Sequence, residues 1–319
     1  MSTIPSSAPR VDTTHLPFVS VIINCYNSAR YLREALESVR TQTYADWEIV
    51  FWDNCSSDES ASIYKSFDDA RFRYFLAPEH TILGAAKKHA IEKARGEWLA
   101  FIDCDDLWLP RKLEKQVAII REEGPELGLV YGRMNILIEE EARATIIGKS
   151  AAVNNYRYAK NHLPEGNIFE HLIHDAFVPQ PSAMVRLAAY QEVGGVNPDF
   201  KHSWDFDLWV KVSKEFKVRA LQEVCCIYRV HGANLSHVQV QQELCFDENI
   251  TILSRYLPHY EAVRAIRGAH TVTAGYKMRQ GKWRIGLMRL FKLGDVVVFA
   301  RKFLVFFWRR LMYCFRQFQ

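Results

Sequence analysis

Short apolar runs alternate with amphipathic stretches through the first third of the chain. The predicted strands are residues 18–23, 47–52, 72–76 and 98–102. The predicted helices between them are residues 29–41, 57–67 and 83–95. Uninterrupted apolar runs that alternate with helices are typical of a parallel sheet covered on both faces. The pattern therefore predicts an α/β fold with a Rossmann-like, mostly parallel sheet flanked by helices.

The pattern is less regular in the rest of the chain. It predicts helices over residues 112–122 and from Trp204, and strands over 127–131, 182–185 and 224–230. Residues 139–180 carry no assignable pattern, and only helices are predicted beyond residue 238. We expect a loose N-terminal tail over 1–17, a domain over 18–237 and a helical extension over 238–319.

Polar residues follow the three strongest apolar runs. They are Asn24, the pair Asp53 and Asn54, and the acidic run over residues 103–106. Ligands of open α/β sheets bind beyond the carboxyl ends of the strands, so these clusters are expected to converge on one cleft. Asp103 and Asp105 can point into one site, and hard oxygen ligands at this spacing suit Mn²⁺ or Mg²⁺. The alternative is a solvated acidic turn in which Asp106 caps the next helix.

Composition and charge narrow the class of protein. With 49% hydrophobic and 24% charged residues among 319, disorder and a polytopic membrane protein are excluded. The seven cysteines include no CxxC pair and follow no export signal, so we expect free thiols in a reducing compartment and no cysteine-based zinc site. Residues 277–319 carry a net charge of +10 and residues 1–276 a net charge of −6. This local basic excess favours contact with an anionic surface, and nucleic acid is not expected as a partner.

Four motifs in order resemble family 2 of the inverting glycosyltransferases. They are VSVIINCYN over residues 19–27, YLREALESV with QTY over 31–44, WEIVFWDNCSSD over 47–58 and GEWLAFIDCDDLWLP over 96–110. The resemblance implies a GT-A fold and a nucleotide-diphosphate sugar donor, with a UDP-sugar favoured. It also implies Mn²⁺ or Mg²⁺ held by the Asp-x-Asp motif.

The resemblance assigns roles by position. Asp53 would bind the nucleotide base, and Asn27 in the first motif is a further donor-binding residue. Asp103 and Asp105 would lie at the ribose, metal and diphosphate. The half over about 18–125 would bind the nucleotide sugar and the half over about 126–237 the acceptor.

A second region resembles the acceptor side of the same family. It comprises GGVNPDF over residues 194–200 and SWDFDLW over residues 203–209. Asp205 falls on the family's catalytic base, which accepts the proton of the acceptor hydroxyl. Asp205 could instead be an N-cap of the helix, and Asp207 ranks second as the base because it lies about 200° around the helix.

The segment YRVHG over residues 228–232 resembles the family's metal and diphosphate segment. His231 is predicted as a metal ligand and Arg229 as a diphosphate contact, with a structural histidine and a surface arginine as the alternatives.

Three positions depart from the family pattern. Asn54 stands where a second acid is usual, and it is kept as a donor-site residue. Trp204 replaces the usual Glu before the base, where it could stack on an acceptor sugar or pack within the fold. The stretch AKKHA over residues 86–90 replaces a common Ala-Arg-Asn motif, and Lys87 or Lys88 could still bind a phosphate.

The C-terminal segment, residues 296–318, has an apolar face and a basic face on a helical wheel. It lacks the length of apolar sequence that a spanning helix needs, and it suits a helix lying in the membrane interface. We expect a cytoplasmic protein that is peripheral at the inner face of the plasma membrane. The alternative is a helix docked on the domain or on a second copy in a homo-oligomer.

These features together predict a metal-dependent inverting glycosyltransferase. It would move a sugar to a hydroxyl of a glycan or lipid-linked acceptor in surface polysaccharide or glycolipid synthesis. The alternatives are a non-catalytic protein that binds nucleotide sugars or glycans, and a nucleotidyltransferase, which would need a Gly-rich phosphate loop that the sequence lacks.

Overall fold

The computed structural model describes residues 16–143, 162–232, 234, 239–280, 282, 285–286 and 288. The described chain forms two compact units, divided after Asn234 except that Ile173–Asp175 belong to the second. The predicted domain boundary at residue 237 stays a prediction, since residues 235–238 lie outside the described residues.

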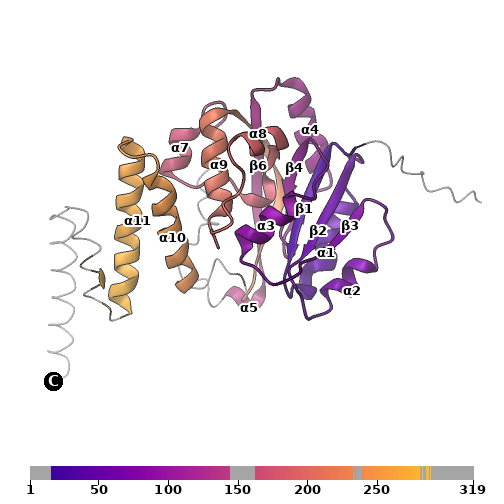
Figure 1. The fold of residues 1–319 in the computed structure, drawn as a ribbon, viewed down its shortest axis with the longest axis horizontal. Helices are drawn as coiled ribbons and strands as arrows, with labels where there is room; N and C mark the ends of the chain where they lie inside the picture. The colour runs from indigo at the N-terminus through magenta and orange to yellow at the C-terminus, as the bar shows by residue number, and fades with distance from the viewer. Residues whose placement is uncertain are drawn as a thin grey trace, which may run out of the picture. The chain divides into compact units, whose positions relative to one another are not determined.

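The first unit begins with the predicted alternation of strands and helices (Figure 1). The strands are β1 (Val19–Cys25), β2 (Trp47–Asp53), β3 (Phe72–Leu76) and β4 (Trp98–Phe101). The helices are α1 (Ala29–Arg40), α2 (Ser60–Lys65), α3 (Leu83–Ile91) and α4 (Lys112–Glu122). In α1 the buried residues recur every three or four positions, so one stripe packs on the sheet while the other face is solvated.

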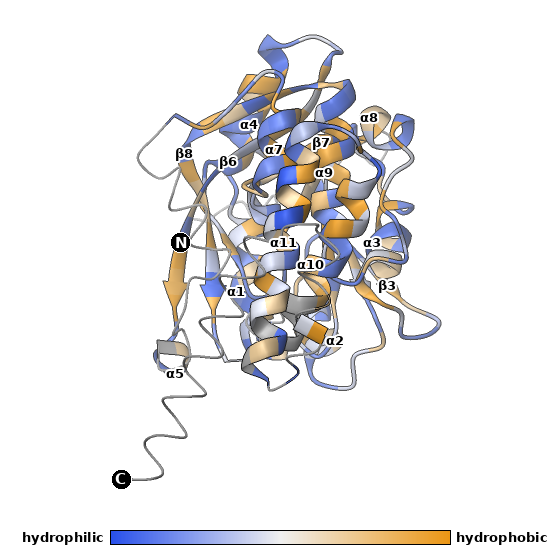
Figure 2. Cartoon of the chain, turned by 90° about the vertical axis from the view of Figure 1, so that its left-hand side faces the viewer, coloured by the Kyte–Doolittle hydropathy of each residue, from blue (hydrophilic) through white to orange (hydrophobic). Residues whose placement is uncertain are grey.

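The second half of this unit adds shorter and less regular elements. The strands are β5 (Leu107–Trp108), β6 (Leu127–Ile138), β7 (Met184–Arg186) and β8 (Lys217–Val230). The helices are α5 (Glu140–Arg143), α7 (Phe169–His174), α8 (Leu187–Glu192), α9 (Trp204–Glu215) and the 3₁₀ turn η1 (Gln180–Ser182). Both glycines of the predicted turn, Gly194 and Gly195, have positive φ values of 81° and 64°. Figure 2 shows both hydrophobic and hydrophilic residues along α9, as expected for a helix with one buried face.

The eight strands found among the described residues form one sheet in the order β3-β2-β1-β4-β7-β6-β8-β5. Among the described strand pairs, four are parallel and three are antiparallel. The α/β sheet predicted from the sequence is confirmed. It is more mixed than the pattern indicated, because β7 runs antiparallel to both β4 and β6. Strands β6 and β8 extend beyond their predicted ranges, since their pairing with each other supplies hydrogen bonds that no apolar run signals.

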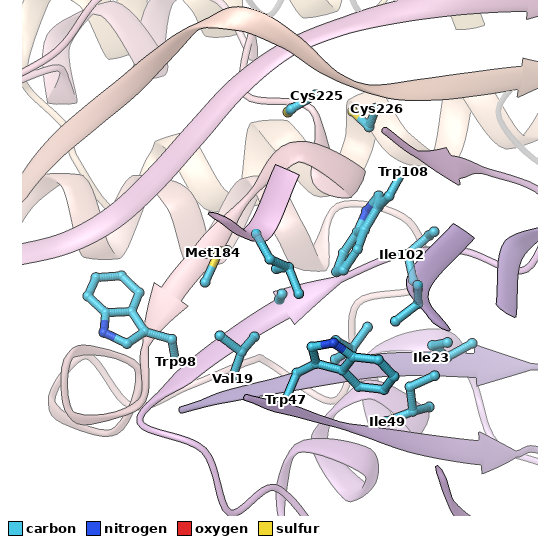
Figure 3. Close-up of a cluster of buried hydrophobic side chains, with 14 of the residues drawn as sticks. Val19, Ile23, Trp47, Ile49, Trp98, Ile102, Trp108, Met184, Cys225 and Cys226 are labelled. Atoms are coloured by element: carbon cyan, nitrogen blue, oxygen red, sulfur yellow. The ribbon is translucent and has the colours of Figure 1, made fainter. Parts of the chain in front are cut away.

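The core of the first unit lies between the sheet and its helices. Figure 3 shows Val19, Trp47 and Ile49 within one buried cluster that also contains Trp98 and Trp108. The cluster contains residues from strands of both halves of the sheet, so its packing holds the ends of these strands in their relative positions.

In the second unit, α10 (Gln239–Ser254) packs against α11 (Tyr260–Arg279). The described part of the chain beyond residue 238 is helical wherever it is regular, as predicted. None of the described helices is both long enough and apolar enough to cross a membrane. The predicted amphipathic segment over residues 296–318 and the tail over residues 1–15 lie outside the described residues.

The start of β4 depends on a glycine. A Cβ on Gly96 would lie 2.6 Å from the backbone nitrogen of Ser20 and 2.8 Å from the carbonyl carbon of Val19. The amide of Gly96 donates to Ser20 Oγ at 2.8 Å, and Ser20 Oγ donates to the buried Glu48 at 2.7 Å. Any side chain at residue 96 would therefore push β4 away from β1.

We predict that Gly96→Ala lowers the free energy of unfolding by about 1–3 kcal/mol, the usual cost of overpacking a buried contact. The matched control is Gly124→Ala, because a Cβ at Gly124 would meet nothing closer than 3.5 Å. Urea denaturation of the two variants measures the difference. Equal stability of both variants would contradict this account of the β1–β4 contact.

Candidate active site

The acidic loop leaves the carboxyl end of β4 beside the end of β1. The amide of Ile102 donates to Ile22 O at 3.4 Å, and Cys104 Sγ contacts Asn24 O at 3.3 Å. The amide of Asp106 then donates back to Asp103 O at 3.2 Å, which closes a turn. The turn carries Asp103 and Asp105 at the edge of the sheet where the sequence placed them.

Asp103 is held by two donors from other elements. Lys87 Nζ, from α3, lies 3.2 Å from Asp103 Oδ1, and Gln180 Nε2 lies 3.3 Å from the same oxygen. The side chain of Lys87 is fully buried, whereas that of Asp103 is 44% exposed. A buried ammonium therefore faces a carboxylate that solvent or a ligand can reach.

Asp105 is held by the segment that follows β8. Its Oδ2 lies 3.0 Å from His231 Nε2 and 3.1 Å from Asn234 Nδ2. His231 also packs against the ring of Tyr31, with the centroids 4.9 Å apart. The structure thus brings together Asp105 and His231, which the sequence analysis assigned to the same metal.

The contact between Asp105 and His231 fits a divalent cation. Two ligand atoms at right angles on a cation with bonds of about 2.1 Å lie about 3.0 Å apart. This is the separation of Asp105 Oδ2 and His231 Nε2. Within the described residues, no three His, Cys, Asp or Glu side chains are grouped to hold a metal ion. A cation here would therefore take its remaining ligands from water and substrate oxygens, as Mg²⁺ and Mn²⁺ commonly do.

Asp106 does not cap α4, because Arg111 occupies the N-cap position of that helix. Asp106 is instead fully buried, and its Oδ1 accepts the amide of Arg229 at 3.0 Å. Burial and the neighbouring carboxylates raise the pKa of Asp106 well above its usual range. Its role is to fix the loop beneath Asp103 and Asp105.

Arg229 is buried and its guanidinium is used inside the protein. Nε donates to Asp105 O at 3.0 Å, Nη1 to Glu139 at 2.7 Å and Nη2 to Glu34 at 2.5 Å. The guanidinium also lies over the ring of Tyr31. Its side chain is only 5% exposed. The prediction that Arg229 contacts diphosphate oxygens is therefore corrected, since the arginine holds the backbone of Asp105.

Asp53 and Asn54 follow β2 but are turned inward. Asp53 is 1% exposed, and its two oxygens accept the amide of Ser56 at 2.8 Å and the hydroxyl of Tyr74 at 2.6 Å. The amide of Asn54 donates to Thr81 O at 2.7 Å. Both side chains stabilise loops at the edge of the sheet, and contact with a nucleotide base stays a prediction.

Asn27 joins the loops that follow β1 and β2. Its side-chain Oδ1 accepts a hydrogen bond from the backbone amide of Ser57 at 2.8 Å, and its backbone amide donates to Ser56 Oγ at 3.1 Å. Its φ of 49° lies in the left-handed region, which asparagine tolerates better than most residues. Asn27 therefore sets the shape of the predicted donor end of the site.

Trp204 and Lys88 are not placed as substrate contacts. Trp204 is 3% exposed and packs on Phe101 and Trp209, with ring centroids 5.4 and 6.4 Å away. The alternative in which it stacks on an acceptor sugar is wrong, because no face of the ring is accessible. Lys88 is exposed, one residue from the buried Lys87 and about 100° around α3. Of the two lysines, Lys87 therefore faces the acidic loop, and a phosphate contact stays a prediction.

Two carboxylates of α9 have different surroundings. Ser203 is the N-cap residue of α9, so Asp205 is not its N-cap. Asp207 is fully buried and forms an ion pair with Lys211 at 2.9 Å. Asp205 is partly exposed, and Asp103 and Lys87 lie close enough to act on its charge. Asp205 is therefore the one of the two that lies near the acidic loop, and its role as the base stays a prediction.

Burial raises the pKa of Asp205 to about 6, and the charge of Asp103 adds to the rise. The amide of Phe206, which donates to Asp205 Oδ1 at 2.8 Å, and the charge of Lys87 act in the opposite direction. A carboxylate with this pKa is largely ionised at neutral pH and is a stronger base than an ordinary aspartate.

Sequence reasoning missed two amides of the site, Gln180 and Asn234. Gln180 lies in the unassigned region, in the 3₁₀ turn η1. Asn234 follows His231 by three residues and its amide also donates to Arg229 O at 3.1 Å. A polar residue at the end of a tight turn after a motif histidine was the available signal for Asn234.

Comparison with known proteins identifies relatives of this chain. Residues 20–186 match Glycosyl transferase family 2. An uncharacterised glycosyltransferase of Rickettsia typhi is 30% identical over 72% of this chain and 69% of its own length. The Escherichia coli enzyme WfgD, a UDP-Glc:alpha-D-GlcNAc-diphosphoundecaprenol beta-1,3-glucosyltransferase, is 26% identical over 68% of this chain and 79% of its own length.

A solved structure confirms the fold. Residues 1–349 of Staphylococcus aureus TarS in complex with UDP-GlcNAc superpose with a TM-score of 0.65, at 18% identity over 86% of this chain and 81% of that one. This GT-A likeness agrees with the fold class that the sequence predicted. The family match over half of the chain and the relative at 30% identity together show that the chain belongs to glycosyl transferase family 2 and is an enzyme.

Proposed function

We propose that this enzyme transfers a sugar from a nucleotide-diphosphate donor to a hydroxyl group of a glycan or lipid-linked acceptor, with inversion at the anomeric carbon. The observation that carries the proposal is the Asp103–Asp105 loop, set between the buried Lys87 on one side and His231 on the other, with Asp205 near Asp103. The names of WfgD and of the TarS complex support a UDP-sugar donor.

The chemistry is a single displacement. The acceptor oxygen forms a bond to the anomeric carbon while the bond from that carbon to the diphosphate oxygen breaks. Asp205 accepts the proton that the acceptor hydroxyl loses. Attack from the face opposite the leaving group inverts the configuration at the anomeric carbon.

The leaving diphosphate carries negative charge into a site that already holds several carboxylates. Asp105 and His231 would hold Mn²⁺ or Mg²⁺ there, and Asp103, the third predicted ligand, lies on the same loop. When bound, the cation neutralises the charge that develops on the diphosphate. Lys87 supplies a fixed positive charge beside Asp103, and its burial strengthens its electrostatic effect on a bound diphosphate.

The non-catalytic binding protein that the sequence left open does not agree with membership of an enzyme family. A protein that only binds a nucleotide sugar has no need of a partly exposed carboxylate whose pKa is raised to about 6 next to the acidic loop. The presence of Asp205 in this environment therefore favours sugar transfer over binding alone.

Substitution of the two neighbouring lysines separates their roles. We expect Lys87→Met to lower the rate of sugar transfer on the order of 10–100-fold. The reason is that Asp103 loses the ammonium group that faces it and the site loses a fixed positive charge. Methionine is similar in volume, so the free energy of unfolding should change little. Lys88→Met is the matched control, with near wild-type transfer. Donor turnover and thermal unfolding are measured for both, and equal transfer rates would contradict the role of Lys87.

Substitution of the base tests the catalytic assignment. Asp205→Asn should lower transfer on the order of 100-fold or more while donor binding is retained, because asparagine cannot accept the proton. Transfer kinetics at pH 8 and calorimetry with UDP measure the two quantities.

The pH dependence checks the same residue. Since the pKa of Asp205 is raised to about 6, the carboxylate is ionised above this pH, and kcat/KM should fall as pH decreases through 6. Asp207→Asn is the control. Because Asp207 pairs with Lys211, this variant should be less stable but should still bind donor and transfer the sugar. If Asp207→Asn bound donor normally but lost transfer, the base would be assigned to the wrong residue.

The place of action is also proposed. The net charge of +10 over residues 277–319 supports peripheral attachment to the inner face of the plasma membrane, where lipid-linked acceptors lie. Each basic residue near an anionic surface contributes about 1 kcal/mol to such attachment. A homo-oligomer formed through the same segment is the alternative.

Truncation after residue 293 tests this attachment. The full chain should sediment with vesicles that contain phosphatidylglycerol, less so at high salt, whereas the truncated chain should stay in solution and still bind UDP. Vesicles of phosphatidylcholine alone are the control. If neither chain sediments, or if the truncated chain unfolds, the segment belongs to the fold or to an oligomer interface.

A further inference from the structure

We propose that Asn234 is a positioning residue, whose side-chain amide fixes the carboxylate of Asp105 in the orientation that receives a divalent cation. The inference rests on the proposed role of Asp105 as a cation ligand. No motif of the sequence analysis included Asn234.

The side chain of Asn234 makes three hydrogen bonds. Nδ2 donates to Asp105 Oδ2 and to Arg229 O, both at 3.1 Å, and Oδ1 accepts the amide of His231. The residue is buried. One side chain therefore joins the carboxylate of Asp105 to the backbone on both sides of Val230.

Without Asn234, the carboxylate of Asp105 would be held by one side-chain contact alone, that with His231. Arg229 holds the backbone oxygen of Asp105, and His231 Nε2 approaches only Oδ2. Asn234 donates a hydrogen bond to Oδ2, so rotation about the bond that carries the carboxylate would break this bond as well as the contact with His231. The donors that surround a cation ligand commonly fix its orientation in this way.

The chemistry of the side chain fits this role better than that of its relatives. Asparagine supplies donors to Asp105 and Arg229 and an acceptor to His231 at the same time. Aspartate would place a second negative charge beside Asp105. Serine could still accept the amide of His231, but its hydroxyl is too short to reach Asp105 as well. The two functions of Asn234, closing the turn and holding the carboxylate, are therefore separable.

A purely structural role would give a different result from a positioning role. If Asn234 only closes the turn over residues 231–234, its loss should lower stability and leave the affinity for a cation unchanged. If it positions Asp105, the affinity should fall even in a variant that keeps the turn. Cation affinity and thermal stability are therefore both measured.

The experiment uses the full chain and MnCl₂ as the probe. Binding of Mn²⁺ is followed by electron paramagnetic resonance, first with MnCl₂ alone and then with UDP present. Asn234→Ala and Asn234→Ser should each weaken Mn²⁺ binding on the order of 10–100-fold. Asn234→Ser should keep a melting temperature close to wild type in the absence of metal. Excess Mn²⁺ should restore most of the transfer rate, because the carboxylate itself is still present.

Two further variants make the result specific. Asn167→Ala is the matched control: Asn167 Oδ1 accepts the amide of Phe169, so this variant loses a similar local hydrogen bond while Asp105 and its partners keep theirs. It should bind Mn²⁺ as wild type does. Asp105→Ala is the reference variant, in which specific Mn²⁺ binding should be lost.

Each outcome decides between the two hypotheses. If Asp105→Ala binds Mn²⁺ as tightly as wild type, the proposed cation site itself fails. If Asp105→Ala loses Mn²⁺ but both Asn234 variants bind it normally, the positioning role alone is overturned. If both Asn234 variants fail to fold, Asn234 is a structural residue and the positioning role is again wrong.

Discussion

The burial of one guanidinium, that of Arg229, is the constraint on which the arrangement of the site depends. A charged side chain removed from water must be paired and hydrogen-bonded, because an unpaired buried charge lowers the free energy of unfolding by several kcal/mol. Arg229 meets this need with Glu34 of α1, Glu139 after β6 and the backbone of Asp105 after β4. These partners come from both halves of the sheet, so satisfying the arginine also brings together the elements that carry the chemistry.

The need to balance charge also explains the surroundings of the acidic loop. Asp106 lies within electrostatic reach of Asp103 and Asp105, and Asp205 lies within reach of Asp103. Their repulsion is relieved in different ways: Lys87 faces Asp103, His231 faces Asp105, and burial favours the protonated form of Asp106. Asp205 is left as the carboxylate with a raised pKa. A negatively charged donor would add to this repulsion, and the proposed divalent cation would offset it.

Some of the predicted site residues could be placed from the sequence next to them, whereas others could not. Asp103 and Asp105 follow a buried strand directly, and parallel strands end at one edge of a sheet, so their place was predictable from β4 alone. Arg229 and Trp204 were assigned to substrates because their residue types suit such contacts. Both are buried, a property set by partners such as Glu34 and Phe101 that lie more than 100 residues away in sequence.

By itself the sequence determined the alternation of β1 to β4 with α1 to α3, since apolar periodicity and strand length are local properties that the backbone must follow. It also placed the acidic loop and the family motifs in order. Only the tertiary structure decided that β7 runs antiparallel, that the two-residue β5 exists at all, and that Lys87 rather than Lys88 faces Asp103. Likewise only the tertiary structure brought Asn234 to Asp105 across 129 residues of chain. Such contacts depend on which distant surfaces meet, and no local pattern encodes that, because the free energy that selects them is released only when the whole core is packed.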